Sequence, residues 1–365
     1  MDGDSLIGFV ERVSGDAHLR VEEDLGGGFV RLRTSEAERR QAVQDIRSSE
    51  DIVIELLRNA RDAHASQIFV ASSKEGDARS FTVVDDGDGI PPSMHRRVFD
   101  SRVTSKLDTS HLDKWGIHGR GMALFSISEN AERAFVQDSL PGLGTSIRVV
   151  TDLKKVGERK DQSTLPRFIK GEGSEVAVRG PRNIARCCFE FAIEARNSCR
   201  VRLGSPTEVA AALYEHGCAS LSELDRMFCA DPSKLPLAKR LATAQDPADF
   251  ASLAAGLGLD ISPRSARRIL DGDIDPAPDL LEAVVIEPAD GPAKPKGGSR
   301  RPHAACGPSP SFDRADVDSL KRSTLRAFAG FADKYYLSDD VEPSVRIERG
   351  RVVVSVPLVV RDDVP

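Results

Sequence analysis

Apolar and polar positions follow a helical period in residues 49–63 and a strand period after them. Ser48 or Ser49 is a suitable N-cap for the helix. Its apolar positions are Ile52, Leu56, Ala60 and Ala63. Two runs of strand composition follow, "SQIFVAS" and "SFTVVDD", on either side of the polar turn "SKEGDA". The pattern predicts a buried helix, then a hairpin that leads into a glycine loop.

The rest of the first 150 residues gives similar signals. The run "HLRVEEDLGGGFVRLR" predicts two short strands around a glycine turn, and "SEAERRQAVQDI" predicts an amphipathic helix. A second helix is predicted at "MALFSISENA", and a second hairpin at "AFVQD" and "GTSIRVV". Residues 91–115 are polar and weakly periodic, and such a long segment inside a compact domain is usually functional or disordered. Residues 1–150 therefore read as one α+β domain.

The pattern changes after residue 150. Residues 151–289 are dominated by helical patterns, with one candidate strand at "EVAVRG". Residues 290–311 are rich in Pro, Gly and basic residues, which is typical of a linker. Residues 312–365 predict a helix and a hairpin that turns at Arg349 and Gly350. We therefore expect a second, mainly helical domain, a linker and a small C-terminal element.

Composition narrows the protein class. The 365 residues are 40% hydrophobic and 30% charged, as in a globular protein, and the net charge of -6 gives no global attraction to nucleic acid. The six cysteines form no CxxC pair, so we expect reduced, mostly buried thiols and no metal on them. The sequence has no apolar run of roughly 20 residues and no basic, apolar leader, so we expect a cytoplasmic protein without membrane contact.

Three polar side chains interrupt the predicted buried helix. Glu55, Asn59 and Asp62 share one face at 3.6 residues per turn. Taken alone, the stretch "ELLRNARDA" is equally consistent with the exposed face of a surface helix. The spacing nevertheless indicates a site, because a carboxylate, an amide and a second carboxylate point the same way.

Two glycine motifs follow in the chain. In "VVDDGDGI", Asp85 ends an apolar strand, and Gly87 and Gly89 let the backbone pass close to a ligand, although a plain turn or a calcium-like loop has the same letters. In "GIHGRG", small residues at the start of a helix let backbone N–H groups surround phosphates. Each motif alone is a weak signal.

The ordered set of "ELLRNARDA", "VVDDGDGI" and "GIHGRGMALFSI" resembles the Bergerat ATP-binding fold of the GHKL family, which includes gyrase, ninety-kilodalton heat-shock chaperones, histidine kinases and MutL. The resemblance covers about residues 15–150. It implies an α/β sandwich, a mixed sheet with helices on one face, followed by the mainly helical region. The "TSK" triplet at 104–106 resembles the lids of MutL and of topoisomerase VI, whereas the three-glycine "GIHGRG" is closer to topoisomerase VI and the chaperones.

The resemblance also implies roles for individual residues. Glu55 would be the general base, Asn59 would hold Mg²⁺, and Asp85, rather than Asp86, would accept a hydrogen bond from the adenine amine. Thr145 would support the pocket from a strand, and Lys106 would reach a phosphate from the lid. The full set implied to contact ATP is Asn59, Asp62, Asp85, Gly87, Gly89, Ile90, Lys106, Gly116, His118, Gly119, Arg120, Gly121 and Thr145.

The family's usual activity leads to two functional hypotheses. The first is a slow ATPase that closes and forms a homodimer when it binds Mg-ATP, acting in a DNA-associated process. The second is a chaperone-like or signalling module that acts on protein partners with little or no hydrolysis. The MutL and topoisomerase branches take a lysine from a following transducer domain, often in a Gln-x-Lys loop, and no such triplet occurs after residue 150.

A weaker signal concerns DNA. Residues 250–275 resemble a helix-turn-helix in which Arg264, Arg267 and Arg268 would face phosphates or bases. The turn is about two residues longer than that pattern allows, so an ordinary helical hairpin is the alternative. The basic linker would extend a DNA contact over residues 260–301, or it is simply a solvated linker.

Overall fold

The structure is a computed structural model, and its described residues are 21–105, 111–113, 116–118, 121–170, 176–287, 314–334, 337–338, 341, 343–348 and 351–359. The chain forms two compact units, Met1–Pro292 and Ala293–Pro365. None of the helices in these described ranges is long and apolar enough to cross a membrane.

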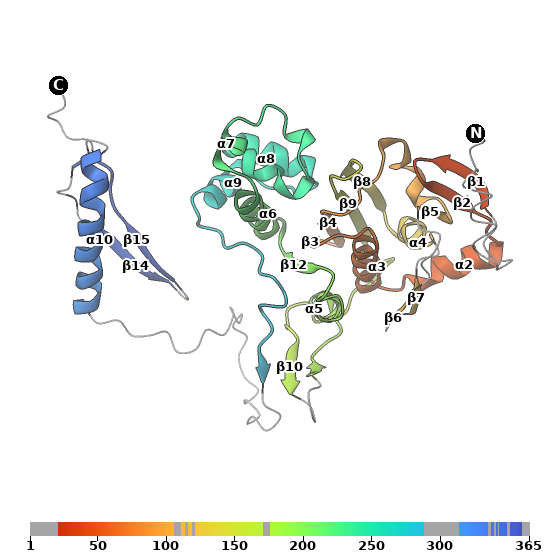
Figure 1. Cartoon of the computed structure of the whole chain (residues 1–365). Coiled ribbons are helices and arrows are strands. Elements are labelled where there is room, and N and C mark those ends of the chain that lie inside the picture. The colour runs from red at the N-terminus through yellow and green to blue at the C-terminus, as the bar shows by residue number, and fades with distance from the viewer. Residues whose placement is uncertain are drawn as a thin grey trace. The chain divides into compact units, whose positions relative to one another are not determined.

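A five-stranded mixed sheet is the centre of the first unit (Figure 1). Its order is β12-β3-β4-β9-β8, in which β12 is parallel to β3 and the other neighbours are antiparallel. The strands are β3 (Gln67–Glu75), β4 (Ala78–Asp85), β8 (Arg133–Ser139), β9 (Thr145–Asp152) and β12 (Arg200–Gly204).

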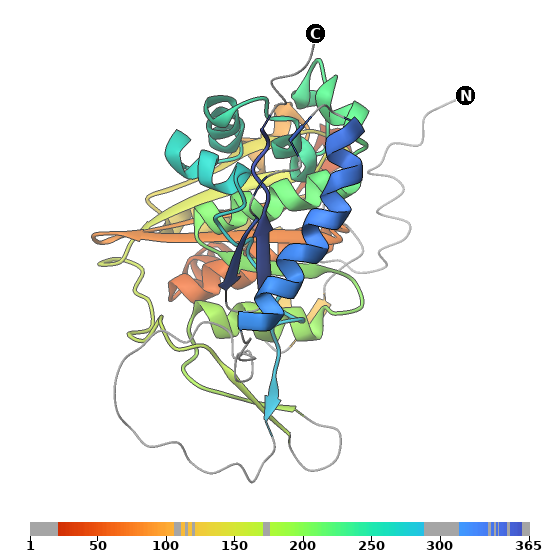
Figure 2. The ribbon, with the colours of Figure 1, turned by 90° about the vertical axis from the view of Figure 1, so that its left-hand side faces the viewer.

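Successive side chains of β3 enter two different hydrophobic cores, because strand residues alternate between the faces of a sheet. Ile68 and Val70 pack with α3, α4 and α5, whereas Phe69 and Ala71 pack with α6, η4, α8 and α9. Figure 2 shows helices on both sides of the orange strands. The helices are α3 (Ser49–Asp62), α4 (Ala123–Asn130), α5 (Ile184–Glu194), α6 (Pro206–Ser220), η4 (Leu237–Thr243), α8 (Pro247–Gly256) and α9 (Pro263–Leu270).

Smaller elements surround this sandwich. A three-stranded sheet joins β1, β2 and β5, β6 pairs with β7, and β10 pairs with both β11 and β13. Their bounds are β1 (Val21–Gly26), β2 (Phe29–Leu32), β5 (Val103–Thr104), β6 (His111–Asp113), β7 (Gly116–His118), β10 (Arg167–Lys170), β11 (Val176–Arg179) and β13 (Ile286–Glu287). The remaining helices are α2 (Glu36–Asp45), η1 (Pro92–Met94), η2 (Arg97–Phe99), α7 (Glu223–Met227) and η3 (Pro232–Lys234).

The second unit contains α10 (Arg314–Lys334) and a hairpin of β14 (Ser344–Glu348) and β15 (Arg351–Ser355). These elements lie where the sequence pattern predicts a helix and a hairpin. The turn predicted at Arg349 and Gly350 lies outside the described residues, as does the linker at 290–311.

The α+β class, the mixed sheet and the helices and hairpins predicted before residue 150 are confirmed. The helical region that was expected to follow the sandwich lies against the second face of its sheet. It also contains a strand that the sequence analysis missed: β12 pairs with β3. The compact unit therefore continues past residue 150 to Pro292, while the division into functional domains stays a prediction.

The turn between α8 and α9 is fixed to the sheet. The Leu257 carbonyl accepts from Ser146 Oγ at 2.8 Å, and the Gly258 carbonyl accepts from Thr82 Oγ1 at 2.9 Å. Gly258 has a φ of +76°, which favours glycine at this turn. The helical pair predicted at 250–275 is therefore present, with its turn against the sheet and Arg264, Arg267 and Arg268 exposed on α9.

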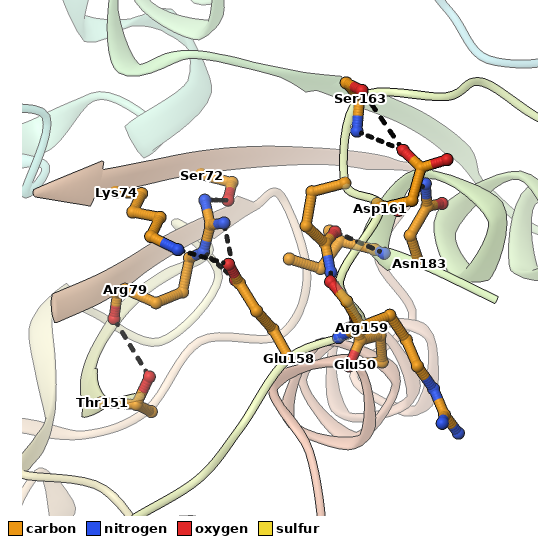
Figure 3. Close-up of polar contacts among 12 residues, drawn as sticks. Glu50, Ser72, Lys74, Arg79, Thr151, Glu158, Arg159, Asp161, Ser163 and Asn183 are labelled. Atoms are coloured by element: carbon orange, nitrogen blue, oxygen red, sulfur yellow. Dashed lines mark hydrogen bonds and ion pairs between the residues drawn. The ribbon is translucent and has the colours of Figure 1, made fainter. Parts of the chain in front are cut away.

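A segment between β9 and β10, residues 153–166, crosses the start of α3, and we call it the brace (Figure 3). Its Gly157 carbonyl accepts from the Ser49 N–H at 2.9 Å. Glu50 Oε1 accepts from the Arg159 N–H at 3.0 Å and from Gln162 Nε2 at 2.6 Å. The first bond satisfies an N–H at the helix N-terminus that has no intrahelical partner, and the other two attach the Glu50 side chain to the brace, so the brace fixes the start of α3.

Glu158 joins the brace to the sheet (Figure 3). Its carboxylate lies 2.6 Å from Arg79 Nη2 and 2.9 Å from Lys74 Nζ, and its side chain is 10% exposed. Burial raises the pKa of Glu158, but hydrogen bonds and positive charge from Lys74 and Arg79 lower it by more, and the net pKa lies below its ordinary value. Glu158 is therefore held as a carboxylate.

We expect Glu158→Gln to lower the free energy of unfolding by about 1–2 kcal/mol near neutral pH, because hydrogen bonds to a charged group are lost. The folded-state pKa is depressed, so this stabilisation is complete above the ordinary value of 4.5 and disappears as the pH falls through the lowered pKa. Urea unfolding at several pH values measures the difference between the two proteins. Glu75→Gln, at an exposed position of β3, is the control. A difference that does not shrink in acid would contradict this account.

Candidate functional site

One cavity of about 610 Å³ lies beside the sheet in the first unit. Its lining comes from α2 and α3, from the ends of β4 and β9, from residues 88–90 and 102–105, and from the start of α4. The volume is within the range of small-molecule sites, roughly 300–1,000 Å³. The cavity therefore brings together segments that are far apart in the sequence.

Helix α3 carries its polar residues into this cavity. Ser48 is the N-cap and forms a capping box with Asp51, and the side chains of Ile52 and Leu56 are buried in the core. The polar residues adjoin the apolar stripe on the helix surface, and Leu56 and Ala60 of that stripe also line the cavity. Its lining includes Glu55, Asn59 and Asp62, as well as Ala63 at the helix end.

Glu55 and Asn59 differ in their partners. Arg58 Nη1 donates to Glu55 Oε1 at 2.5 Å, with Arg58 4% and Glu55 20% exposed. Asn59 Nδ2 is buried and has no hydrogen-bond partner among the described residues. Buried polar groups in proteins are normally paired, so an unpaired amide on a cavity wall is a group that a ligand can satisfy. The sequence analysis did not consider Arg58, although it lies inside the same motif.

Asp85 and Asp86 point to different places. Asp85 lines the cavity, is 5% exposed, and its Oδ1 accepts from the Gly87 N–H at 2.9 Å. Asp86 Oδ1 instead accepts from the N–H groups of Ser66 at 2.7 Å and Gln67 at 2.8 Å. Asp85 is thus the carboxylate that a ligand in the cavity meets.

The glycines after Asp85 are required by close backbone contacts. A Cβ at Gly87 would lie 2.4 Å from the Ala63 carbonyl oxygen, and one at Gly89, where φ is +75°, would lie 2.0 Å from that of Leu140. Real Cβ atoms do not approach so closely. Gly87 therefore packs against the end of α3, and Gly89 lines the cavity beside the turn between β8 and β9.

Ser139 connects the remaining residues of this wall. Its Oγ accepts from the Ile90 N–H at 2.6 Å, donates to the Gly144 carbonyl at 2.9 Å, and lies 3.2 Å from Thr145 Oγ1. Ile90 and Thr145 line the cavity, and Thr145 pairs directly with Asp85 across β4 and β9. Sequence reasoning missed Ser139, because a serine at a strand end carries no motif.

The start of α4 forms another part of the lining. Gly121, with a φ of +67°, and residues 122–124 line the cavity, and no described side chain caps the helix. The first N–H groups of a helix lack intrahelical partners and attract anions. Lys106, Gly119 and Arg120 lie outside the described residues. Gly116 and His118 lie in strand β7, and only their backbone is described.

Arg102 is a further cavity residue that the sequence analysis missed. It is 7% exposed and forms an ion pair with Glu38 of α2. The expected lid cation was Lys106, four residues later, and the sequence around Arg102 contains no signal for its burial.

These donors and acceptors fit an adenine nucleotide. A buried carboxylate suits the adenine amine, uncapped N–H groups suit phosphates, and Asn59, whose amide nitrogen has no partner among the described residues, follows Glu55 by one turn of α3. Magnesium prefers oxygen ligands, and the side-chain oxygen of Asn59 is one. The cavity thus has the chemistry to accept both ATP and its cation.

Comparison with known proteins points to the same region. Residues 44–155 match the family described as "Histidine kinase-, DNA gyrase B-, and HSP90-like ATPase". The DNA mismatch repair protein MutL of Lactiplantibacillus plantarum is 39% identical over 99 residues, which are 26% of this chain and 14% of that protein.

The MutL proteins of Staphylococcus carnosus and Staphylococcus aureus strain Newman are each 37% identical over 110 residues. These residues are 29% of this chain and 17% and 16% of the two relatives, so the chain spans a small part of the length of the proteins it matches. The matched region contains the cavity-lining residues of α3, β4, α4 and β9. Residues 44–155 of this chain thus form a domain that matches the histidine kinase-, DNA gyrase B- and HSP90-like ATPase family.

Proposed function

We propose that this chain binds Mg-ATP in the cavity and hydrolyses it slowly, and that ATP binding closes the lid and brings two copies together. The observation that supports the proposal best is the convergence of Asp85, Asn59 and Glu55 with the uncapped start of α4 on one cavity. These groups lie in separate parts of the sequence, yet each has a chemical partner in Mg-ATP.

Each residue has a distinct part in the proposal. Asp85 accepts from the exocyclic amine of adenine, which selects adenine over guanine. Glu55 positions and deprotonates the water that attacks the γ-phosphate, and the N–H groups of α4 hold the phosphates. Asn59 holds Mg²⁺, which neutralises charge on the phosphates. Arg58 orients Glu55 through their ion pair.

We further propose that the switch acts in a DNA-associated process. The matched relatives are named as DNA mismatch repair proteins, and α9 exposes three arginines. Three exposed aspartates, Asp260, Asp271 and Asp273, surround α9 and reduce its attraction for phosphate.

The first test compares Asp85→Asn with Asp86→Asn, an identical change in the adjacent carboxylate. We expect Asp85→Asn to weaken ATP binding about tenfold or more, because the amide presents a donor to the adenine amine and a hydrogen bond to a charged group is lost. Asp86→Asn should leave the affinity unchanged, since Asp86 bonds to Ser66 and Gln67. Calorimetry with ATP and magnesium measures both. Wild-type protein that binds no adenine nucleotide would overturn the proposal.

Glu55→Ala separates binding from hydrolysis. We expect ATP affinity to stay within a few-fold and turnover to fall by about 10²–10⁴, the usual contribution of a general base. Single-turnover assays measure this, with molar mass recorded in the presence of a nonhydrolysable analogue to detect the dimer. Unchanged turnover in Glu55→Ala would exclude this residue as the base and favour a nucleotide-binding module without hydrolysis.

The DNA proposal has its own test. Replacing Arg264, Arg267 and Arg268 with Gln should weaken DNA binding and reduce its salt dependence, by a slope of about one for each phosphate contact removed. Arg196→Gln, at an exposed position on the other side of the sheet, is the control. DNA titrations at several salt concentrations measure the affinity and its salt dependence for each protein. Equal slopes in the wild type and both variants would place any DNA contact elsewhere.

A further inference from the structure

The cavity is strongly acidic for a site that holds phosphates. Among its described lining residues, eight are carboxylates and two are cations. The cations are Arg58, which is paired with Glu55, and Arg102, which is paired with Glu38. One Mg²⁺ neutralises only part of the charge of a polyphosphate, and both described cations of the lining already have a carboxylate.

Arg102 has an uncommon backbone conformation. Its φ is +54°, a region that side chains other than glycine rarely adopt and that is associated with functional sites. Neighbouring strands hold it there: the Arg102 carbonyl accepts from the Leu32 N–H at 3.0 Å, and Val103 and Thr104 pair with β2. The strained position directs a charged residue into the interior, where the whole residue is 7% exposed.

The guanidinium of Arg102 has unused hydrogen-bonding capacity. Nη2 pairs with Glu38 Oε1, whereas Nε is buried and has no partner among the described residues. Buried guanidinium groups favour bidentate oxyanions, such as a phosphate, because their donors form a planar fork. The cavity thus contains a cation that is incompletely satisfied by its protein partner.

Arg102 lies at the glycine end of the cavity. A Cβ at Gly121 would be 3.2 Å from the Arg102 carbonyl carbon and 3.0 Å from the Val103 carbonyl oxygen. Gly121 leads directly into α4, whose first N–H groups are the expected phosphate donors. The backbone of Arg102 therefore adjoins Gly121 and the end of the cavity where the phosphates of a nucleotide would lie.

Glu38 connects this arginine to α2. Its Oε2 accepts from the N–H of Ser35, the N-cap of α2, at 2.9 Å, so one carboxylate both caps the helix and binds Arg102. Helix α2 has a single buried residue, Ala42, and its Glu38 and Asp45 line the cavity. Two contacts with α4 also hold the helix, from Asn130 Nδ2 to the Val43 carbonyl at 2.9 Å and from Arg39 over the Phe125 ring, so the Glu38–Arg102 pair is one of several tethers. Phosphates beside the carboxylates of α2 would repel it.

We infer that Arg102 binds the phosphate chain of the nucleotide and that the phosphates replace Glu38 as its partner. The exchange releases this tether of α2 and adds like-charge repulsion, so phosphate binding is transmitted to α2 as increased mobility. The inference rests on the proposed ATP-binding function and adds to it a cation that recognises phosphate and a helix that responds.

The test uses the full chain with two probes, ATP and adenosine, which has no phosphate. We expect Arg102→Met to weaken ATP binding about tenfold or more and to leave adenosine binding unchanged. Glu38→Gln should strengthen ATP binding several-fold, because the competing charge is removed, while a glutamine at this position still forms the capping box. Glu36→Gln, on the same helix but outside the cavity lining, should change neither.

Hydrogen exchange of residues 36–45 reports the response of α2. We expect ATP to speed exchange in the wild type, and Glu38→Gln to exchange quickly even without nucleotide. If Arg102→Met is poorly folded, ATP affinity and hydrogen exchange are measured in Arg102→Lys and Glu38→Gln instead, because both variants keep a polar side chain. Suppose that the wild type binds ATP, but Glu38→Gln and the Arg102 variants match it in ATP affinity and in hydrogen exchange. That result contradicts this inference and leaves the proposed ATP-binding function standing. Failure of the wild type to bind any adenine nucleotide overturns the proposed function as well.

Discussion

The close packing of the turn at residues 85–89 is the constraint on which the rest of the site depends. The Asp88 N–H donates to the Ala63 carbonyl at 2.8 Å, and the Asp88 carbonyl accepts from the Gly142 N–H at 2.7 Å. One turn thereby joins the end of α3 to the connection between β8 and β9. Any side chain at Gly87 or Gly89 would separate these elements, and the cavity walls would move apart with them.

The two-sided sheet explains why a small domain can hold an open cavity. Burying both faces of β3 and β4 gives the sheet two apolar cores, and the elements that carry the site are anchored on one of them. The brace adds a polar constraint at the start of α3. Glu50 accepts a hydrogen bond from the Arg159 N–H of the brace, and Glu158 of the brace forms an ion pair with Arg79 of the sheet. Rigid support of this kind keeps Glu55 and Asn59 in a fixed relation to Asp85.

The walls of the cavity differ in how firmly they are held. Ile90 and Thr145 contact Ser139 through hydrogen bonds, and Thr145 pairs with Asp85 across β4 and β9. Helix α2 has a single buried residue, and Glu38, Arg39 and Val43 make its polar and cation–π contacts with its neighbours. A firm wall at the Asp85 side and a loosely held wall beside Arg102 suit a site that binds a base rigidly and responds to the groups attached to it. Carboxylates outnumber cations in the described lining, so a bound anion competes with these carboxylates for the two arginines.

The sequence by itself determined the local elements and the motif residues. The helical period of α3 predicts that Glu55, Asn59 and Asp62 share one face beside the apolar stripe, because this period is a property of the chain alone. Glycine spacing likewise predicts where backbones approach each other. The tertiary structure alone decided what depends on distant contacts. It placed β12 beside β3, the turn of α8 and α9 on the sheet, Ser139 between Ile90 and Thr145, and Glu38 against Arg102. These contacts join residues that are far apart in the sequence, and such contacts produce no periodic pattern of apolar and polar positions.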